Sequence, residues 1–132
     1  MKKKYQICYM GGDGIGPEVT AQSIKLLEAT GIGFGFMHAE IGFETYKKYG
    51  TPLPEKTIEI CRKSDAILFG AITTPPNIKG YFSPIVRLRK TLDLYANVRP
   101  FKSLPIPDQK HGIDFIIVRE NTEDLYVGQE RL

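Results

Sequence analysis

The chain has 132 residues, which is enough for one domain or for part of a larger one. Its 18 basic and 15 acidic side chains leave a net charge of +3, a balance that argues against a nucleic-acid-binding protein. No apolar run approaches the roughly 20 residues of a membrane span, and the basic start lacks the apolar segment of a secretory signal. We therefore predict a cytoplasmic protein without a membrane partner. Cys8 and Cys61 match no metal or redox spacing, so they are predicted to be reduced and buried.

The first predicted elements are a strand, a glycine-rich turn and a helix. Residues 5–10 read as a short strand that runs into Gly11-Gly12-Asp13-Gly14-Ile15-Gly16. Pro17 suits the first turn of a helix, and Gly31 is a natural stop. This order is typical of the beginning of an α/β domain.

The next elements continue the α/β pattern. A second strand is predicted over residues 32–41 and a short helix over 43–49, which Gly50 closes. A further helix opens at Glu55 and carries an apolar face. Residues 66–70 (AILFG) form a continuous apolar run, as expected for a strand buried on both faces. The loop over residues 71–81 follows the carboxyl end of that strand, where open α/β sheets bind ligands, although it can equally be an ordinary connector.

A basic segment over residues 83–100 reads as a helix followed by a strand. Ser83 and Pro84 suit the helix start, and residues 94–99 read as a strand that Pro100 stops. The segment contains several cations: Arg87, Arg89, Lys90 and Arg99. Guanidinium groups can converge on carboxylates, and the alternative interpretation is a solvated basic helix face.

The chain ends on a loop, a strand and a polar run. Residues 101–112 are loop-like, residues 113–118 (IDFIIV) are predicted to form a buried strand, and residues 119–126 are densely polar. The glycine turn fails as a dinucleotide fingerprint, because Pro17 stands where G-x-G-x-x-G requires glycine. The carboxylates and histidines form no spaced metal-ligand set, so no metal site is predicted. By itself, Tyr126 is better explained as an aromatic at the edge of the core than as an acid.

Three stretches together resemble one enzyme family: GGDGIGPEV (11–19), LRKTLDLYANVRP (88–100) and VRENTEDLYVG (118–128). They are similar to the isocitrate, isopropylmalate and homoisocitrate dehydrogenases, which are metal-dependent β-decarboxylating enzymes. The resemblance implies an α/β fold, the N-terminal part of the isocitrate/isopropylmalate dehydrogenase-like fold, with a sheet flanked by helices and incomplete in this chain. Residues 1–100 would belong to the large, cofactor-side domain, and residues 101–132 would begin the second, substrate and dimerisation domain.

The same resemblance implies roles for individual residues. The substrate-binding residues would be Ser83, Arg89, Arg99 and Arg119. Tyr126 falls on the tyrosine that acts in acid–base chemistry after decarboxylation. Thr74 would lie beside the nicotinamide, and Ile15 would line the adenosine side of the cofactor.

The implied reaction begins when a hydride leaves C2 of a 2-hydroxy acid for NAD or NADP. The resulting β-keto acid loses CO₂ and leaves an enolate, which a tyrosine can protonate. Mg²⁺ or Mn²⁺ would polarise the developing oxyanion, but by resemblance the metal ligands and the catalytic lysine lie beyond residue 132. A small-molecule di- or tricarboxylate and a homodimer of the full-length enzyme are therefore the expected partners, and the 132 residues are expected to be inactive alone.

The choice of substrate rests on two regions. ENTEDLY after Arg119 resembles the isocitrate and homoisocitrate branches, so these substrates rank first. Ile85 and Val86 could instead form an apolar rest for an isopropyl group, which keeps 3-isopropylmalate as the alternative. A hypothesis of another class is a non-catalytic fragment that is stabilised by association with a partner chain.

Overall fold

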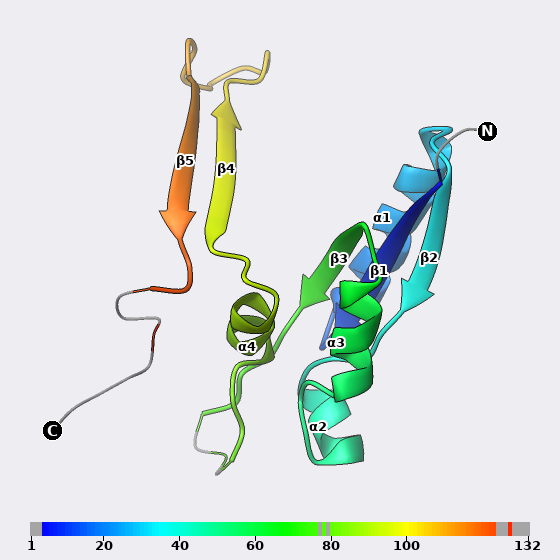
Figure 1. Ribbon diagram of the computed structural model, residues 1–132. Helices are drawn as coiled ribbons and strands as arrows, with labels where there is room; N and C mark the ends of the chain where they lie inside the picture. Colours follow the sequence, from blue (N-terminus) through cyan, green and yellow to red (C-terminus); the bar gives the residue numbers. More distant parts are fainter. Residues whose placement is uncertain (1–3, 77, 79, 124–126, 128–132) are drawn as a thin grey trace, which may run out of the picture. The chain divides into compact units, whose positions relative to one another are not determined.

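The computed structural model describes residues 4–76, 78, 80–123 and 127 (Figure 1). These residues fall into two compact units, Met1–Leu88 and Arg89–Leu132, and each is described by itself. No helix in the described ranges is long and apolar enough to cross a bilayer.

The first unit contains a three-stranded parallel sheet with helices between its strands. Its elements are β1 (Tyr5–Gly12), α1 (Gly16–Ala29), β2 (Phe34–His38), α2 (Phe43–Tyr49), α3 (Glu55–Arg62) and β3 (Ala66–Ala71). The strand order is β2-β1-β3, so β1 is the central strand. The chain therefore leaves β1 toward one side through α1 and returns across the sheet to pair β3 on the other side.

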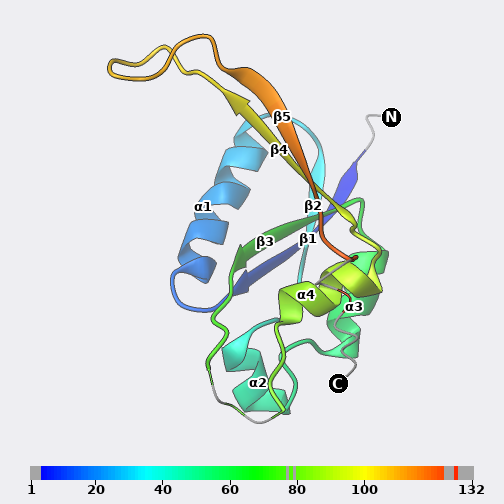
Figure 2. The ribbon, with the colours of Figure 1, turned by 90° about the vertical axis from the view of Figure 1, so that its left-hand side faces the viewer.

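Helices α1 and α3 cover opposite faces of this sheet (Figures 1 and 2). Right-handed crossovers require this arrangement when successive connections run in opposite directions across a sheet. The burial of side chains along β1 agrees with helices on both faces, because Ile7 is buried on one face of the sheet while Cys8 and Met10 are fully buried on the other. The core therefore consists of two thin layers on either side of the central strand.

The helix ends follow the local signals in the sequence. Pro17 lies in the first turn of α1, and Gly31 adopts a left-handed φ of 74° just after the helix. Helix α2 spans the predicted residues 43–49, and Gly50 closes it with a φ of 73°. The predictions for these helices are confirmed.

The second unit is built around an antiparallel ribbon of two strands. Helix α4 (Pro84–Thr91) spans the division between the units, and β4 (Ala96–Lys102) and β5 (Asp114–Glu120) form the ribbon. Their register pairs Val98 with Val118 and Phe101 with Phe115. The stacked rings of this last pair lie 5.3 Å apart between centroids.

Three predicted strand properties were wrong. Strand β4 does not stop at Pro100, which pairs with Ile116, because the strand has a single neighbour and a proline nitrogen can face away from it. Strand β5 forms as predicted but is exposed along its whole length, because no other described helix or strand of its unit packs over the ribbon. Strand β3 is only half-buried, because it is an edge strand of the described sheet and one of its long sides has no neighbouring strand there. The predicted boundary between two domains after residue 100 stays a prediction.

Candidate substrate and cofactor sites

The turn after β1 lies against the end of β3. Gly12 has a φ of 73°, and a Cβ atom there would lie 2.0 Å from the carbonyl oxygen of Ala71. The amide of Asp13 donates to the same oxygen at 2.7 Å. Glycine is therefore required at residue 12 for both its backbone conformation and the close approach of the two strand ends.

Asp13 joins three segments through its buried carboxylate. It accepts hydrogen bonds from the amides of Phe43 at 2.9 Å and Glu44 at 3.1 Å, which are the first residues of α2. It also accepts the amide of Thr73 at 2.9 Å, in the loop after β3. The approach depends on Gly42, where a Cβ atom would lie 2.6 Å from the carboxylate oxygens. The side chain thus caps α2 from a distant part of the chain and fixes the loop after β3.

The same loop is held from a second direction by Tyr81. Its hydroxyl donates to the carbonyl of Thr73 at 3.0 Å, so both backbone groups of Thr73 are bonded. The ring of Tyr81 makes edge contacts with Phe43 and Tyr46, with centroids 5.8 and 5.2 Å away. Burial and the nearby charge of Asp13 raise the pKa of the Tyr81 hydroxyl. These contacts give the loop that contains Thr74 a fixed backbone.

The two residues predicted to contact the cofactor lie at these strand ends. The Ile15 side chain is 70% exposed at the start of α1, and Thr74 is exposed one residue beyond the anchored Thr73. In the order β2-β1-β3 the carboxyl ends of β1 and β3 form a topological switch point, which is where open α/β sheets bind ligands. The structure thus brings the segments of Ile15 and Thr74 together, while their contact with a cofactor stays a prediction.

The start of α1 is unsuited to bind a pyrophosphate. The amide of Gly16 already donates to the carbonyl of Asp13 at 2.9 Å, Pro17 has no N–H group, and Glu18 adds a negative charge. Dinucleotide sites of the G-x-G-x-x-G type need free amides at this position. The geometry of this turn therefore agrees with the sequence, whose glycine spacing does not match G-x-G-x-x-G.

The second unit places two predicted substrate arginines on one face of its ribbon. Arg119 lies directly opposite Asn97, and Arg99 lies directly opposite Ile117. Opposite residues of an antiparallel pair share a face, so Arg99 and Arg119 are diagonal neighbours on it. The Nε of Arg99 donates to the side-chain oxygen of Asn97 at 3.1 Å, which orients the guanidinium group along the strand.

The remaining predicted residues have different positions. Ser83 belongs to the first unit, where its carbonyl accepts the amide of Arg87 at 3.2 Å in the first turn of α4. Arg89 belongs to the second unit, and its carbonyl accepts the amide of Leu94 at 2.8 Å, which turns the chain from α4 toward β4. Tyr126 lies outside the described residues.

A turn after β5 is organised by Glu120, whose role the sequence did not reveal. Its carboxylate accepts the amide and hydroxyl of Thr122 at 2.8 and 2.7 Å and the amide of Glu123 at 2.6 Å. These hydrogen bonds, those from Thr122 first, lower the pKa of Glu120 to about 2. The segment that leads toward residue 126 therefore starts from an ordered turn.

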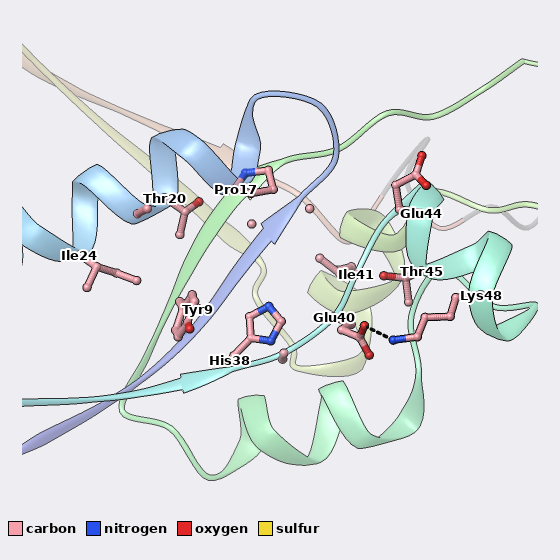
Figure 3. Close-up of a pocket in the computed structure, with 14 residues that line it drawn as sticks. Tyr9, Pro17, Thr20, Ile24, His38, Glu40, Ile41, Glu44, Thr45 and Lys48 are labelled. Atoms are coloured by element: carbon pink, nitrogen blue, oxygen red, sulfur yellow. Dashed lines mark hydrogen bonds and ion pairs between the residues drawn. The ribbon is translucent and has the colours of Figure 1, made fainter.

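A cavity of about 490 Å³ opens between α1 and the segment after β2 (Figure 3). Tyr9, Pro17 and Ile24 contribute apolar surface, and Glu40 and Lys48 form an ion pair of 2.9 Å at its side. Hydrogen bonds from Lys48 and from a neighbouring tyrosine hydroxyl hold the pKa of Glu40 below its usual value. None of the predicted site residues that the structure describes lines this cavity, so we place the candidate cofactor site at the strand ends instead.

The described residues offer no cluster of three or more histidine, cysteine, aspartate or glutamate side chains that could hold a metal ion.

Comparison with known proteins identifies the family. The sequence model of the family described as "Isocitrate/isopropylmalate dehydrogenase" matches residues 6–132. The chain is 52% identical over 128 residues to an isocitrate/homoisocitrate dehydrogenase of Thermus thermophilus, covering 96% of this chain and 38% of that protein. It is 48% identical over 140 residues to a homoisocitrate dehydrogenase of Methanocaldococcus jannaschii, covering 96% and 40%.

A solved structure agrees with the sequence comparisons. The crystal structure of isocitrate dehydrogenase from Methylococcus capsulatus matches with a TM-score of 0.86 and 40% identity, covering 95% of this chain and 37% of that one. The chain thus spans about two fifths of the length of the curated relatives it matches. The fold is the N-terminal part of the α/β fold of these enzymes, as predicted. The chain belongs to the isocitrate/isopropylmalate dehydrogenase family.

Proposed function

We propose that this chain provides part of the substrate and cofactor sites of an NAD(P)-dependent β-decarboxylating dehydrogenase. The substrate is a 2-hydroxy acid of the malate type, with homoisocitrate or isocitrate favoured. The observation that carries the proposal is the register of β4 and β5, which places Arg99 and Arg119 on one face. Relatives named isocitrate/homoisocitrate and homoisocitrate dehydrogenase support this choice of substrate.

The arginines hold the substrate by its carboxylates. A guanidinium group presents a planar fork of donors that matches a carboxylate, and two such groups on one face fix a dicarboxylate in orientation as well as position. A hydrogen bond to a charged group contributes about 1.5–3 kcal/mol, so the loss of one arginine should weaken binding about 10- to 100-fold. Arg89 contributes a third cation, and Ser83 supplies a hydroxyl to the substrate.

NAD or NADP, when bound, would supply the acceptor for the hydride that leaves C2 of the substrate. Ile15 offers an exposed apolar surface for the adenosine side, and Thr74 presents a hydroxyl on a loop that Asp13 and Tyr81 hold in place. A fixed loop matters because hydride transfer depends on near-contact geometry between donor and acceptor. Tyr126 protonates the enolate that remains after CO₂ leaves.

We further propose that the 132 residues are inactive alone, because they span about two fifths of the relatives' length. By resemblance to the family, the divalent cation would be held by residues beyond residue 132. When full length, the enzyme would act in the cytoplasm as a homodimer or higher homo-oligomer.

Binding and turnover test the proposal separately. Homoisocitrate, isocitrate and 3-isopropylmalate are titrated into the chain while the amide resonances of β4 and β5 are followed by NMR. Arg99→Lys and Arg119→Lys should each weaken binding about 10-fold or more, because lysine lacks the bidentate fork. Arg62→Lys, at the exposed end of α3 in the other unit, should leave binding unchanged. An equal effect of all the variants, or no binding of any acid, would refute the substrate site.

Turnover is then measured as formation of reduced nicotinamide with NAD and NADP, Mg²⁺ and Mn²⁺, and each acid in turn. We expect none from the chain alone. Reduction of either cofactor would contradict the proposal that residues outside this chain are indispensable.

The alternative substrate is 3-isopropylmalate. Ile85 and Val86 are half-buried near the start of α4 and could pack against an isopropyl group. Tighter binding of 3-isopropylmalate than of homoisocitrate would decide for it, and Val86→Arg should then reverse the preference.

A non-catalytic role is the second candidate. Strand β5 exposes consecutive apolar side chains, with Val118 at 66% and Ile116 at 62%, and soluble monomers rarely expose such a run. If the chain is stabilised by association with a second copy of itself, its average mass in solution should rise with protein concentration. Val118→Lys should abolish this rise. A monomeric mass at all concentrations would exclude self-association.

A further inference from the structure

We propose that Cys8 and Cys61 form an oxidisable dithiol pair that closes into an internal disulfide across the core of the first unit. The two sulfur atoms lie 3.7 Å apart, within hydrogen-bond distance for sulfur. Cys8 is fully buried and Cys61 is 4% exposed. The sequence spacing of 53 residues hides this pairing, which only the packing of α3 on the sheet creates.

The backbone holds both thiols in place. Cys8 lies in the middle of the central strand, where it pairs with Met37 of β2 and Ile67 of β3. Cys61 lies in the last turn of α3, on the apolar side that also buries Ile58. Because two strand ladders fix one cysteine and a packed helix fixes the other, the short distance is a property of the fold.

The remaining gap is small. A disulfide requires about 2.05 Å between the sulfur atoms, so the pair must close by about 1.7 Å. Rotation about the χ1 angles and a slight movement of α3 can supply this closure, since α3 has only eight residues. Thiols held at this distance meet each other far more often than they meet a second molecule.

The chemistry requires a hydroperoxide as the oxidant. The sulfur of Cys61 attacks one peroxide oxygen as its thiolate, which breaks the O–O bond, and the proton that the thiol has lost passes to the leaving oxygen, giving a sulfenic acid and one water. The sulfur of Cys8 then attacks the sulfenic sulfur, forming the S–S bond and releasing a second water. Two thiols and one hydrogen peroxide thus give one disulfide and two waters.

The electrostatics of the pair favour this order of steps. The hydrogen bond between the thiols and the burial of Cys8 raise the pKa of Cys8, while the same hydrogen bond lowers the pKa of Cys61. Of the two thiols, Cys61 is therefore the one that ionises more readily, and Cys8 is the partner that resolves the sulfenic acid. Because both thiols are buried, a reagent reaches them only when the unit opens briefly. A small peroxide can enter through such an opening more readily than a bulky thiol reagent.

The test uses the whole chain, whose two cysteines are the only ones it has. The native protein is treated with hydrogen peroxide, the remaining thiols are alkylated after denaturation, and the intact mass and peptide map are recorded. We expect the free thiols to fall together from two to none. The monomer should lose the mass of two hydrogen atoms, and one peptide should join residues 8 and 61. The Cys8→Ser and Cys61→Ser variants should show no internal cross-link.

Two comparisons keep the test decisive. The native chain should form the bond faster than the chain in guanidinium chloride, because only the fold brings the sulfur atoms together. The oxidised chain should unfold at a higher temperature than the reduced one, because the bond constrains the unfolded state. Oxygen adducts on single cysteines, disulfide-linked dimers, no faster closure in the native state, or a lower unfolding temperature would each overturn the proposal.

Discussion

Replacement of Asp13 by asparagine tests whether one carboxylate fixes the candidate cofactor site. In the native turn one oxygen accepts the amides of Phe43 and Thr73, and the other accepts the amide of Glu44. Asparagine has a single acceptor oxygen. It can therefore keep the first two bonds only by turning its NH₂ group toward the amide of Glu44, where two donors face each other. Since a hydrogen bond to a charged group contributes about 1.5–3 kcal/mol, Asp13→Asn should lower the free energy of unfolding by about 2–3 kcal/mol.

Urea unfolding followed by far-ultraviolet circular dichroism measures this loss. Asp65→Asn is the matched control, because the carboxylate of Asp65 accepts one amide, that of Gln6 at 2.7 Å, at an exposed position. Asparagine can supply that single acceptor, so the control should cost less than about 1 kcal/mol. Hydrogen exchange locates the effect, because the amides of Phe43, Glu44 and Thr73 should exchange faster in Asp13→Asn alone. If Asp13→Asn is no more destabilising than Asp65→Asn, the reasoning about the capping carboxylate is wrong.

The other predictions concern the same turn, its loop and the turn after β5. Gly16→Ala should cost about 3 kcal/mol or more in urea unfolding, because its Cβ atom would lie 2.0 Å from the carbonyl oxygen of Gly11; a cost below 1 kcal/mol would contradict the close approach. Tyr81→Phe removes the 3.0 Å hydrogen bond to the carbonyl of Thr73 and should lower the free energy of unfolding by about 1 kcal/mol. The amide of Thr73 should then exchange as fast as in the native chain or faster. The pKa of Glu120 is lowered to about 2, so its turn should persist below the usual glutamate pKa and open as the pH falls through about 2. Carbon-detected NMR titration of this carboxyl group checks the value, and a midpoint near 4 would disprove it.

Local signals in the sequence predict the helices of the first unit well. Helix α2 begins at Phe43 and ends at Tyr49, as expected from the glycine that follows it and adopts a left-handed conformation. In α3 the predicted apolar face is confirmed, because Ile58 and Cys61 are both buried. Such features depend on residues within one or two helical turns of each other, and a sequence reports these directly.

Features that depend on distant segments could not be predicted in this way. Asp13 appears in the sequence as an ordinary acidic residue in a glycine-rich turn, yet its carboxylate bonds residues 30 and 60 positions away. The contact between Cys8 and Cys61 is hidden for the same reason. Apolar composition correctly indicated a strand in this region, which the structure has as Asp114–Glu120, but it could not show that the side chains of this strand are exposed. The burial of a strand depends on the elements that pack against it, and its own sequence does not specify these elements.

The arginine face shows how much a site can depend on register. The sequence identifies Arg99 and Arg119 as candidate carboxylate ligands, but they share a face only because residue 119 pairs with residue 97. A slip of one residue would turn Arg119 to the opposite face of the ribbon. Ser103 supports this register at the end of the ribbon, since its amide donates to the carbonyl of Ile113 at 2.8 Å and its hydroxyl donates to the carbonyl of Lys110 at 2.6 Å. The hydroxyl also accepts the amide of Ile113 at 2.9 Å. A neutral serine at the far end of the ribbon therefore helps to hold the register that places two charged side chains on one face.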